Sequence, residues 1–309
     1  MANDRRGWWV AVGSFVLWGL MPLYWHLLKT VPSLQIIAHR IVWSTLLVCA
    51  WLVWKYGRGW LRATLAQPRA AWMLALSGFF IALNWGLYIW AVNAGHVVET
   101  SLGYFINPLL NVLLGVVVLH ERLNRTQWVS VAVATAGVLW LTFNYGQFPW
   151  IALTLAVSFG IYGLIRKVVA VQPIRGLGVE SVYLFLPALG LLFWGETHGD
   201  GGFAGAWGWR IDLLLVLGGA LTALPLIGYA FAVRNIPFSI VGILQYIAPT
   251  MQLLCGVLVL GEPFARERAV GFVLIWIALA IFVGDGLWRR RGAKTVPKEI
   301  ETVVIDCPR

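Results

Sequence analysis

The feature of this sequence that most constrains its fold is an internal repeat. The stretch Ala91–Glu121 returns in altered form at Ala232–Glu262, and Pro108 of the first copy corresponds to Pro249 of the second. The offset between matching residues is 141. It holds without a gap over roughly 60 residues, which chance similarity would not produce. The chain is therefore the product of a duplication.

The composition decides what kind of duplicated protein this is. Of the 309 residues, 60% are hydrophobic and 12% are charged, whereas soluble domains contain about 25% charged residues. A water-soluble fold of this size could not hide so much apolar surface, so we expect an integral membrane protein. The three cysteines are scattered, without a CxxC pair or a nearby histidine, which predicts neither a disulfide nor a metal site.

Ten stretches are apolar enough to be spanning helices, for which about 20 residues are needed. They lie at 8–28, 34–54, 71–92, 97–119, 128–145, 149–165, 179–195, 211–233, 238–260 and 269–287. The first follows Arg5 and Arg6, as the apolar part of a signal peptide would. It is long, however, and lacks a small-x-small cleavage site, so we interpret it as a spanning helix.

Lysine and arginine are distributed unequally between the two sides of these helices. Eighteen lie on the side of the N-terminus and four on the other, with Arg40 inside the second helix. The positive-inside rule then places both termini in the cytoplasm. The same rule accounts for the formal charge of +10, so we expect the lipid bilayer as a partner and not nucleic acid.

An odd number of helices in each repeat forces the second copy to enter the membrane upside down. The first repeat comprises residues 1–146, the second comprises 147–288, and 289–309 form a polar cytoplasmic tail that we expect to be disordered. The predicted fold is all-α, with ten transmembrane helices in two inverted-topology five-helix repeats. Secondary transporters commonly have this architecture and bind their substrate near the midplane, where the halves meet.

Arg40 is the first candidate site residue, because a charged side chain inside a spanning helix is costly and tends to be functional. It lies about 10 Å below the outer end of its helix, at roughly 1.5 Å per residue. Arg40 would present a fixed positive charge to an anionic substrate group such as a carboxylate. Alternatively, it extends to the outer headgroups or binds a neighbouring helix end. The adjacent His39 could titrate or form a structural hydrogen bond.

Amide and phenol side chains gather on helices 3 and 4 and on their counterparts in the second repeat. The candidate lining residues are Asn84, Tyr88, Tyr104, Asn107, Asn111, Tyr229, Gln245 and Tyr246. Those of helix 4 follow an i, i+3, i+7 spacing, which places them on one face. They would line a polar, uncharged substrate cavity. The alternative is hydrogen bonding between helices, worth about 0.6 kcal/mol for each bond.

The mirrored prolines, Pro108 and Pro249, lie in the middle of spanning helices. Each removes a backbone hydrogen bond and bends its helix, so we expect gating bends beside the cavity, against the alternative of a passive kink. Glu121 and Glu262 are also mirrored, and we expect each to stabilise the N-terminus of the following helix. Small residues such as Gly219 suit close helix approach.

Several kinds of chemistry leave no signature in the sequence. No acidic residue lies near a helix centre, so no carboxylate proton relay is expected. There is no GxxxxGK[ST] loop for ATP and no HExxH or GxSxG motif. We therefore expect no enzyme activity, no catalytic residue, no metal and no cofactor.

Five segments resemble the RarD proteins of the EamA group in the drug/metabolite transporter superfamily. They are 18–25 (WGLMPLYW), 38–44 (AHRIVWS), 103–109 (GYFINPL), 119–123 (LHERL) and 244–250 (LQYIAPT). The resemblance covers the chain to about residue 285. It implies two inverted five-helix repeats in a bacterial inner membrane and export of amino acids or other small metabolites. The RarD name is also attached to chloramphenicol permeation.

These features together predict a secondary transporter of the inner membrane, acting as a monomer or a homodimer. It would export a small metabolite, an amino acid-like compound or a drug-like compound by alternating access. A non-transporting receptor or scaffold is an alternative of another class. Flipping of a lipid-linked substrate is an alternative within the same architecture.

Overall fold

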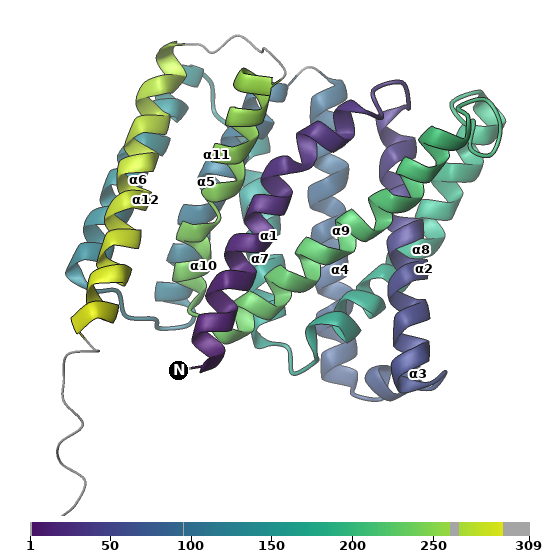
Figure 1. Cartoon of the computed structure of the whole chain (residues 1–309), viewed down its shortest axis with the longest axis horizontal. Coiled ribbons are helices and arrows are strands. Elements are labelled where there is room, and N and C mark those ends of the chain that lie inside the picture. Colours follow the sequence, from purple (N-terminus) through teal and green to yellow (C-terminus); the bar gives the residue numbers. More distant parts are fainter. Residues whose placement is uncertain (1, 95, 260–265, 293–309) are drawn as a thin grey trace, which may run out of the picture.

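The protein is a bundle of helices, seen in a computed structural model that describes residues 2–94, 96–259 and 266–292. All regular elements within these residues are helical (Figure 1). They are α1 (Ala2–His26), α2 (Ser33–Tyr56), α3 (Trp60–Leu65), α4 (Pro68–Asn93), α5 (Val97–Val117), α6 (Arg125–Tyr145), α7 (Trp150–Val168), α8 (Pro173–His198), α9 (Trp209–Asn235), α10 (Phe238–Leu244), α11 (Ile247–Leu254), the π-helical turn η1 (Cys255–Val259) and α12 (Arg266–Gly292).

The described helices have the length and apolarity of a multi-pass membrane protein. Eight of them are long and apolar enough to cross a bilayer, and two shorter apolar stretches lie in α5 and α12, at Leu102–Val117 and Ala269–Asp285. The span predicted at 238–260 is divided, because α10, α11 and η1 follow one another within it. The N-terminus of α1 and the last turn of α12 lie at the same end of the bundle (Figure 1).

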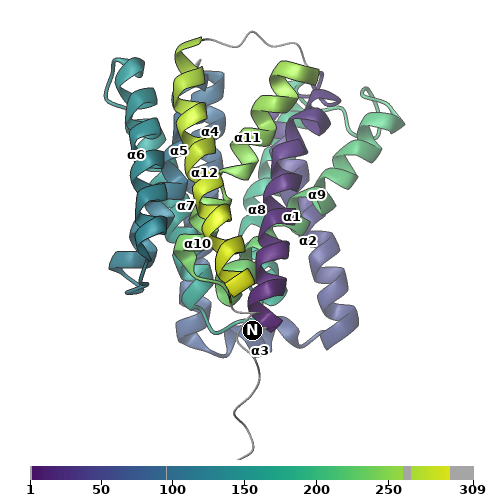
Figure 2. The same cartoon turned by 60° about the vertical axis from the view of Figure 1, so that its left-hand side comes forward.

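The helices of the two predicted repeats intermingle instead of forming two separate bundles. α4 and α5 both pack on α7, while α1 packs on α9 and α11, and α2 lies between α8 and α9. α6 and α12 pair with each other at one edge of the molecule (Figures 1 and 2). The largest apolar core lies where these helices cross and includes Phe15, Tyr162, Tyr229 and Phe238. Residues far apart in the sequence therefore meet at the centre.

Two glycines allow helices from opposite halves to approach closely. A Cβ atom at Gly219 of α9 would lie 2.6 Å from the backbone nitrogen of Ser44 in α2. A Cβ atom at Gly242 of α10 would lie 2.6 Å from the carbonyl oxygen of Pro108 in α5. Real Cβ contacts are longer, so any side chain at these positions would push the helices apart. The contact at Gly219 agrees with its interpretation from the sequence as a close-approach residue.

We predict that Gly219→Ala destabilises the protein by about 1–3 kcal/mol, because overpacking of a tight helix contact forces the backbones to shift. The readout is the midpoint of thermal unfolding in detergent, followed by tryptophan fluorescence. Gly190→Ala in α8 is the matched control, since nothing lies within 4 Å of a Cβ atom there. The control should be as stable as the wild type or slightly more so. Equal midpoints for both variants would contradict the close α2–α9 contact.

Candidate functional site

Arg40 of α2 is held among neutral groups, without a carboxylate partner in the described part of the chain. Its Nε donates a hydrogen bond of 2.9 Å to Oγ1 of Thr222 in α9. The guanidinium carbon lies 4.5 Å from the ring centre of Trp25 and 5.6 Å from that of Trp85. Such cation–π contacts contribute about 0.5–2 kcal/mol each. The positive charge is thus fixed in place and is not neutralised by any described carboxylate.

Two of the predicted tyrosines adjoin this arginine. The rings of Tyr88 in α4 and Tyr104 in α5 meet edge to face, with centroids 5.9 Å apart. Both phenols are close enough to Arg40 to interact with its charge. Tyr104 keeps 40% of its surface accessible, and Arg40 and Tyr88 are only partly buried. We call these residues the Arg40 cluster: Trp25, Arg40, Trp85, Tyr88, Tyr104 and Thr222.

A second group of predicted residues meets where α5 crosses the junction between α10 and α11. Nδ2 of Asn111 donates to Oε1 of Gln245 at 2.7 Å, and the Tyr246 hydroxyl donates to the carbonyl of Phe105 at 3.1 Å. The side-chain oxygens of Asn107 and Asn111 are buried and have no hydrogen-bond partner among the described residues. Unpaired buried amide oxygens are costly, so this crossing has acceptor capacity left for a ligand.

The mirrored prolines have different surroundings. Pro249 lies in the first turn of α11, where its ring cannot donate a hydrogen bond to the carbonyl of Gln245 four residues earlier. The regular α-helix accordingly ends at Gln245 and Tyr246, where the chain keeps right-handed helical torsions but forms a tighter turn with hydrogen bonds between residues three apart. Pro108 lies inside α5, which continues past it without such a turn.

Two predicted lining residues are engaged elsewhere. Nδ2 of Asn84 donates to the carbonyl of Leu155 at 2.8 Å and to Oγ of Ser158 at 3.0 Å, which ties α4 to α7. Tyr229 is fully buried and stacks on Tyr162, with ring centroids 6.1 Å apart. Its hydroxyl has no partner within the described structure. These two residues therefore join helices in the core, apart from the Arg40 cluster.

His39 is surrounded by aromatic side chains that hold its ring in place. Its Nδ1 accepts a hydrogen bond of 3.3 Å from the Trp43 indole, and its ring lies 4.8 Å from that of Phe203. Phe203 and Trp207 belong to the connection between α8 and α9, which the glycine-rich sequence predicts to be flexible. That connection instead folds against α2 and α9, because its aromatic side chains find an apolar surface there.

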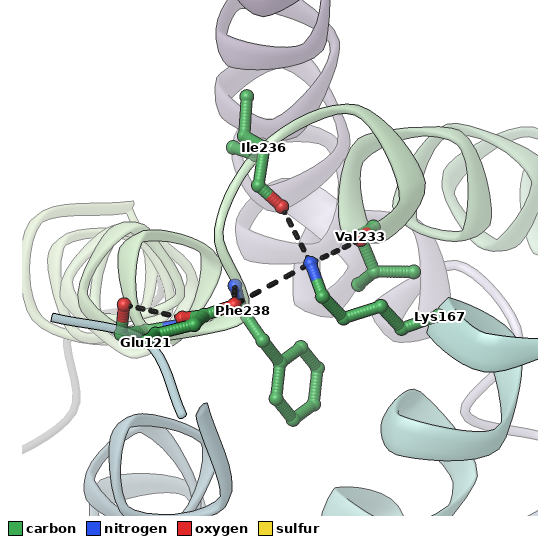
Figure 3. A network of polar contacts seen from close by, with 6 residues as sticks. Glu121, Lys167, Val233, Ile236 and Phe238 are labelled. Atoms are coloured by element: carbon green, nitrogen blue, oxygen red, sulfur yellow. Dashed lines mark hydrogen bonds and ion pairs between the residues drawn. The ribbon is translucent and has the colours of Figure 1, made fainter. Parts of the chain in front are cut away.

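A network at the end of the bundle where α9 meets α10 was not predicted (Figure 3). The Glu121 carboxylate accepts hydrogen bonds from the backbone N–H groups of Phe238 and Ser239 at 2.6 and 2.8 Å. It also accepts from the Ser239 hydroxyl at 2.7 Å. Lys167 lies 3.5 Å from the carboxylate and donates to the carbonyls of Val233 and Ile236, both at 3.0 Å. We call this arrangement the corner network.

The corner network corrects the expectation that Glu121 stabilises the next helix. α6 is capped by Asn124, whose side chain accepts from the backbone of Gln127 in a reciprocal capping box. Glu121 is therefore left for the N-terminus of α10, while Lys167 neutralises the carbonyl end of α9. The spacing of Asn124 and Gln127 was the available signal in the sequence. The mirrored Glu262 lies outside the described residues.

Comparison with known proteins places the chain in a family. The model of the EamA-like transporter family matches residues 5–143 and again 149–284. The protein RarD of Streptomyces exfoliatus is 44% identical over 99% of this chain and 97% of its own length. An uncharacterized transporter, YojE of Bacillus subtilis, is also 44% identical, over 95% and 99% of the two chains.

The chain belongs to the RarD branch of the EamA-like transporter family. A solved structure that covers 89% of this chain and 96% of its own has a TM-score of 0.67 at 19% identity, so it shares the fold. In this EamA-like transporter, the two family matches fall on either side of the connection between α6 and α7. The Arg40 cluster draws on both of them.

The pKa of Glu121 follows from its surroundings in the corner network. Burial alone raises the pKa of this carboxyl, but the hydrogen bonds from Ser239 and Phe238 and the charge of Lys167 together outweigh burial and lower it. The folded protein therefore binds this proton less readily than the unfolded chain does. Glu121 stabilises the fold above the ordinary carboxyl pKa of about 4.3, and this contribution is lost as the pH falls through the lower folded pKa.

We predict that Glu121→Gln lowers the stability of this EamA-like transporter by about 1.5–3 kcal/mol at neutral pH, the contribution of a charged hydrogen-bonding group. The difference in unfolding midpoint between wild type and variant should shrink as the pH falls below about 4. Thermal unfolding across a pH series measures both. Asp200→Asn, which alters an exposed carboxylate, serves as the control and should change little. A Glu121 difference that stays constant into acid would refute the assignment.

Proposed function

We propose that this protein is a secondary transporter of the bacterial inner membrane that exports a small amino acid-like metabolite by alternating access. The observation that carries the proposal is the Arg40 cluster. A guanidinium that is bordered by aromatic rings and unpaired with any described carboxylate suits a substrate that has a carboxylate and an apolar body. Arginine binds carboxylates in a bidentate fashion, and the rings supply apolar contact area.

The arrangement of helix contacts supports the proposed inverted repeats. In this scheme α1 corresponds to α7, α2 to α8, α4 to α9, α5 to the divided span α10–α11, and α6 to α12. Each contact between two helices should then have a mirrored counterpart. The contact of α1 with α9 mirrors that of α4 with α7, and the contact of α1 with α11 mirrors that of α5 with α7. Likewise, α2 with α9 mirrors α4 with α8. Ten spanning helices in two repeats, 1–146 and 147–288, account for this pattern.

A pair of residues on the proposed symmetry axis gives further support. Tyr246 contacts Phe105, and these residues are separated by the same 141 positions that relate the two repeats. Equivalent positions touch only where an axis passes between them. The Arg40 cluster and the α5–α10 crossing would then border the interface between the halves, where transporters of this architecture bind substrate.

The proposed orientation places the corner network on the cytoplasmic side. The ends of α2, α7 and α9 and the start of α1 lie at one end of the bundle (Figure 1), and each of these four helix ends carries basic residues. Both termini would then be cytoplasmic. In the proposed cycle, the corner network closes the cytoplasmic end, and the tighter turn before Pro249 bends when that end opens.

Ligand binding tests the role of Arg40. The purified protein is screened by thermal shift against amino acids, their analogues and chloramphenicol, since a ligand of the native state raises its stability. We expect hits that carry a carboxylate. Arg40→Gln should weaken their binding by about 10–100-fold, because it removes a charge-assisted hydrogen bond. Arg210→Gln, at the exposed start of α9, is the control. Unchanged binding by Arg40→Gln would remove Arg40 from the substrate site.

Cysteine accessibility tests alternating access against a static receptor or scaffold. Asn107→Cys and Gln245→Cys are made in a background without the native cysteines, and membrane-impermeant reagents are applied from either side. Both positions are buried here, so a packed scaffold predicts no labelling. A transporter that opens to either side in turn predicts labelling of these positions from opposite sides, modulated by substrate. Protection of both from both sides, with and without a ligand found in the screen, would contradict transport.

A further inference from the structure

A buried ion pair lies near the Arg40 cluster, with a small cavity between them. Arg166 of α7 and Glu180 of α8 are 1% and 2% exposed, and their closest nitrogen and oxygen atoms are 3.2 Å apart. The Ser77 hydroxyl donates to the same Glu180 oxygen at 2.7 Å, and Arg166 also donates to the carbonyl of Pro173 at 2.6 Å. The other oxygen of the Glu180 carboxylate is buried and has no partner in the described chain.

The ion pair lies toward one end of the bundle, because Arg166 belongs to the last turn of α7. Glu180 is seven residues from the start of α8 at Pro173, or about 10 Å along the helix. It faces α4 and α7, from which Ser77 and Arg166 contact it. A pair with a purely structural role would be expected to satisfy both carboxylate oxygens, because an unpaired buried acceptor is costly.

A small cavity lies between Glu180 and two members of the Arg40 cluster, Trp85 and Thr222. Its volume is about 20 Å³, enough for roughly one water molecule. Its polar lining consists of Glu180 and the hydroxyl-bearing residues Ser44, Tyr162, Ser181 and Thr222. Trp85 also lines it, and both Trp85 and Thr222 contact Arg40. The cavity and the arginine are therefore separated by a wall one residue thick.

The groups around Glu180 leave it as the only acid facing this cavity among the described residues. From α7 it faces Arg166 and Tyr162, and from α9 the phenol of Tyr229 stacks on Tyr162. Arg234 of α9 lies near Arg166. From α2 and α4, the groups nearest the cavity and the carboxylate are uncharged hydroxyls, those of Ser44 and Ser77.

We propose that Glu180 is a proton-binding site that couples substrate movement to the proton gradient, an inference that rests on the proposed transport function. A proton from water binds the unpartnered oxygen and neutralises the carboxylate, and the same proton leaves when the cavity opens to the opposite side. Arg166 would still donate to the Pro173 carbonyl, but its ion pair with Glu180 would become a hydrogen bond to a neutral carboxyl. The interaction that joins α7 to α8 would therefore weaken. A proton fits better than a metal ion, because Arg166 already occupies the carboxylate.

The proposed direction of transport fixes the sign of the coupling. An inward proton gradient drives export only if proton and substrate exchange for one another. Substrate must therefore lower the proton affinity of Glu180, and by reciprocity protonation must lower the affinity for substrate.

Infrared difference spectroscopy of the protein in lipid bilayers tests the proposal without a known substrate. A protonated buried carboxyl has its own carbonyl band, which we expect to appear as the pH is lowered. The band should vanish in Glu180→Gln and in the charge-balanced Arg166→Gln/Glu180→Gln, which guards against misfolding of the single variant. It should persist in Glu99→Gln, where another buried carboxylate binds the N–H of Ile151. No titrating band removed by Glu180→Gln would overturn the proposal.

The second arm adds a carboxylate ligand found in the thermal-shift screen. We expect it to move the midpoint of the Glu180 band to lower pH by about one unit for each tenfold of coupling. An unmoved midpoint would overturn the coupling, whereas a midpoint moved upward would keep Glu180 as the proton site and overturn the export direction. If no ligand is found, the band still decides whether Glu180 titrates, so the two proposals fail separately.

Discussion

The bilayer imposes the constraint on which the rest of this structure depends. In hydrocarbon a polar side chain finds no water, so each one must be paired inside the bundle or serve a ligand. Asn84 and the corner network follow the first course, with every contact directed at another helix. Arg40, Asn107 and Glu180 each have a charge or an acceptor that the described protein does not saturate, and these are the three to which our proposals assign a ligand or a proton.

The sequence was informative about which residues are unusual and less so about their neighbours. A charge or a phenol inside an apolar helix is visible from composition alone, which is why Arg40, Tyr88 and Tyr104 could be selected. Helical periodicity predicts the face on which a side chain lies, but it does not say which helix that face meets. Tyr229 was selected by the same reasoning, yet it packs on Tyr162 in the core.

Long-range pairing explains the parts that could not be predicted. Glu121 binds α10 across 117 residues of sequence, and no local pattern encodes that choice beyond the capping box that satisfies α6 without it. Glu180 seemed to lie near a helix end, because the apolar stretch begins only at residue 179. The structure extends α8 back to Pro173 and buries the carboxylate against α4 and α7. Both outcomes depend on where helices meet in space.

The two repeats share a sequence pattern but differ in conformation, and this difference has a physical use. Pro108 sits in a continuous helix, whereas the helix before Pro249 is interrupted at Gln245. Two equivalent elements in different states have similar energies, because the same residue types can adopt either one. Exchanging their conformations would interchange the open and closed ends of the bundle at small net cost. The asymmetry at these prolines is therefore what the inverted repeats that we propose would need in order to move a substrate, whereas a static scaffold would gain nothing from it.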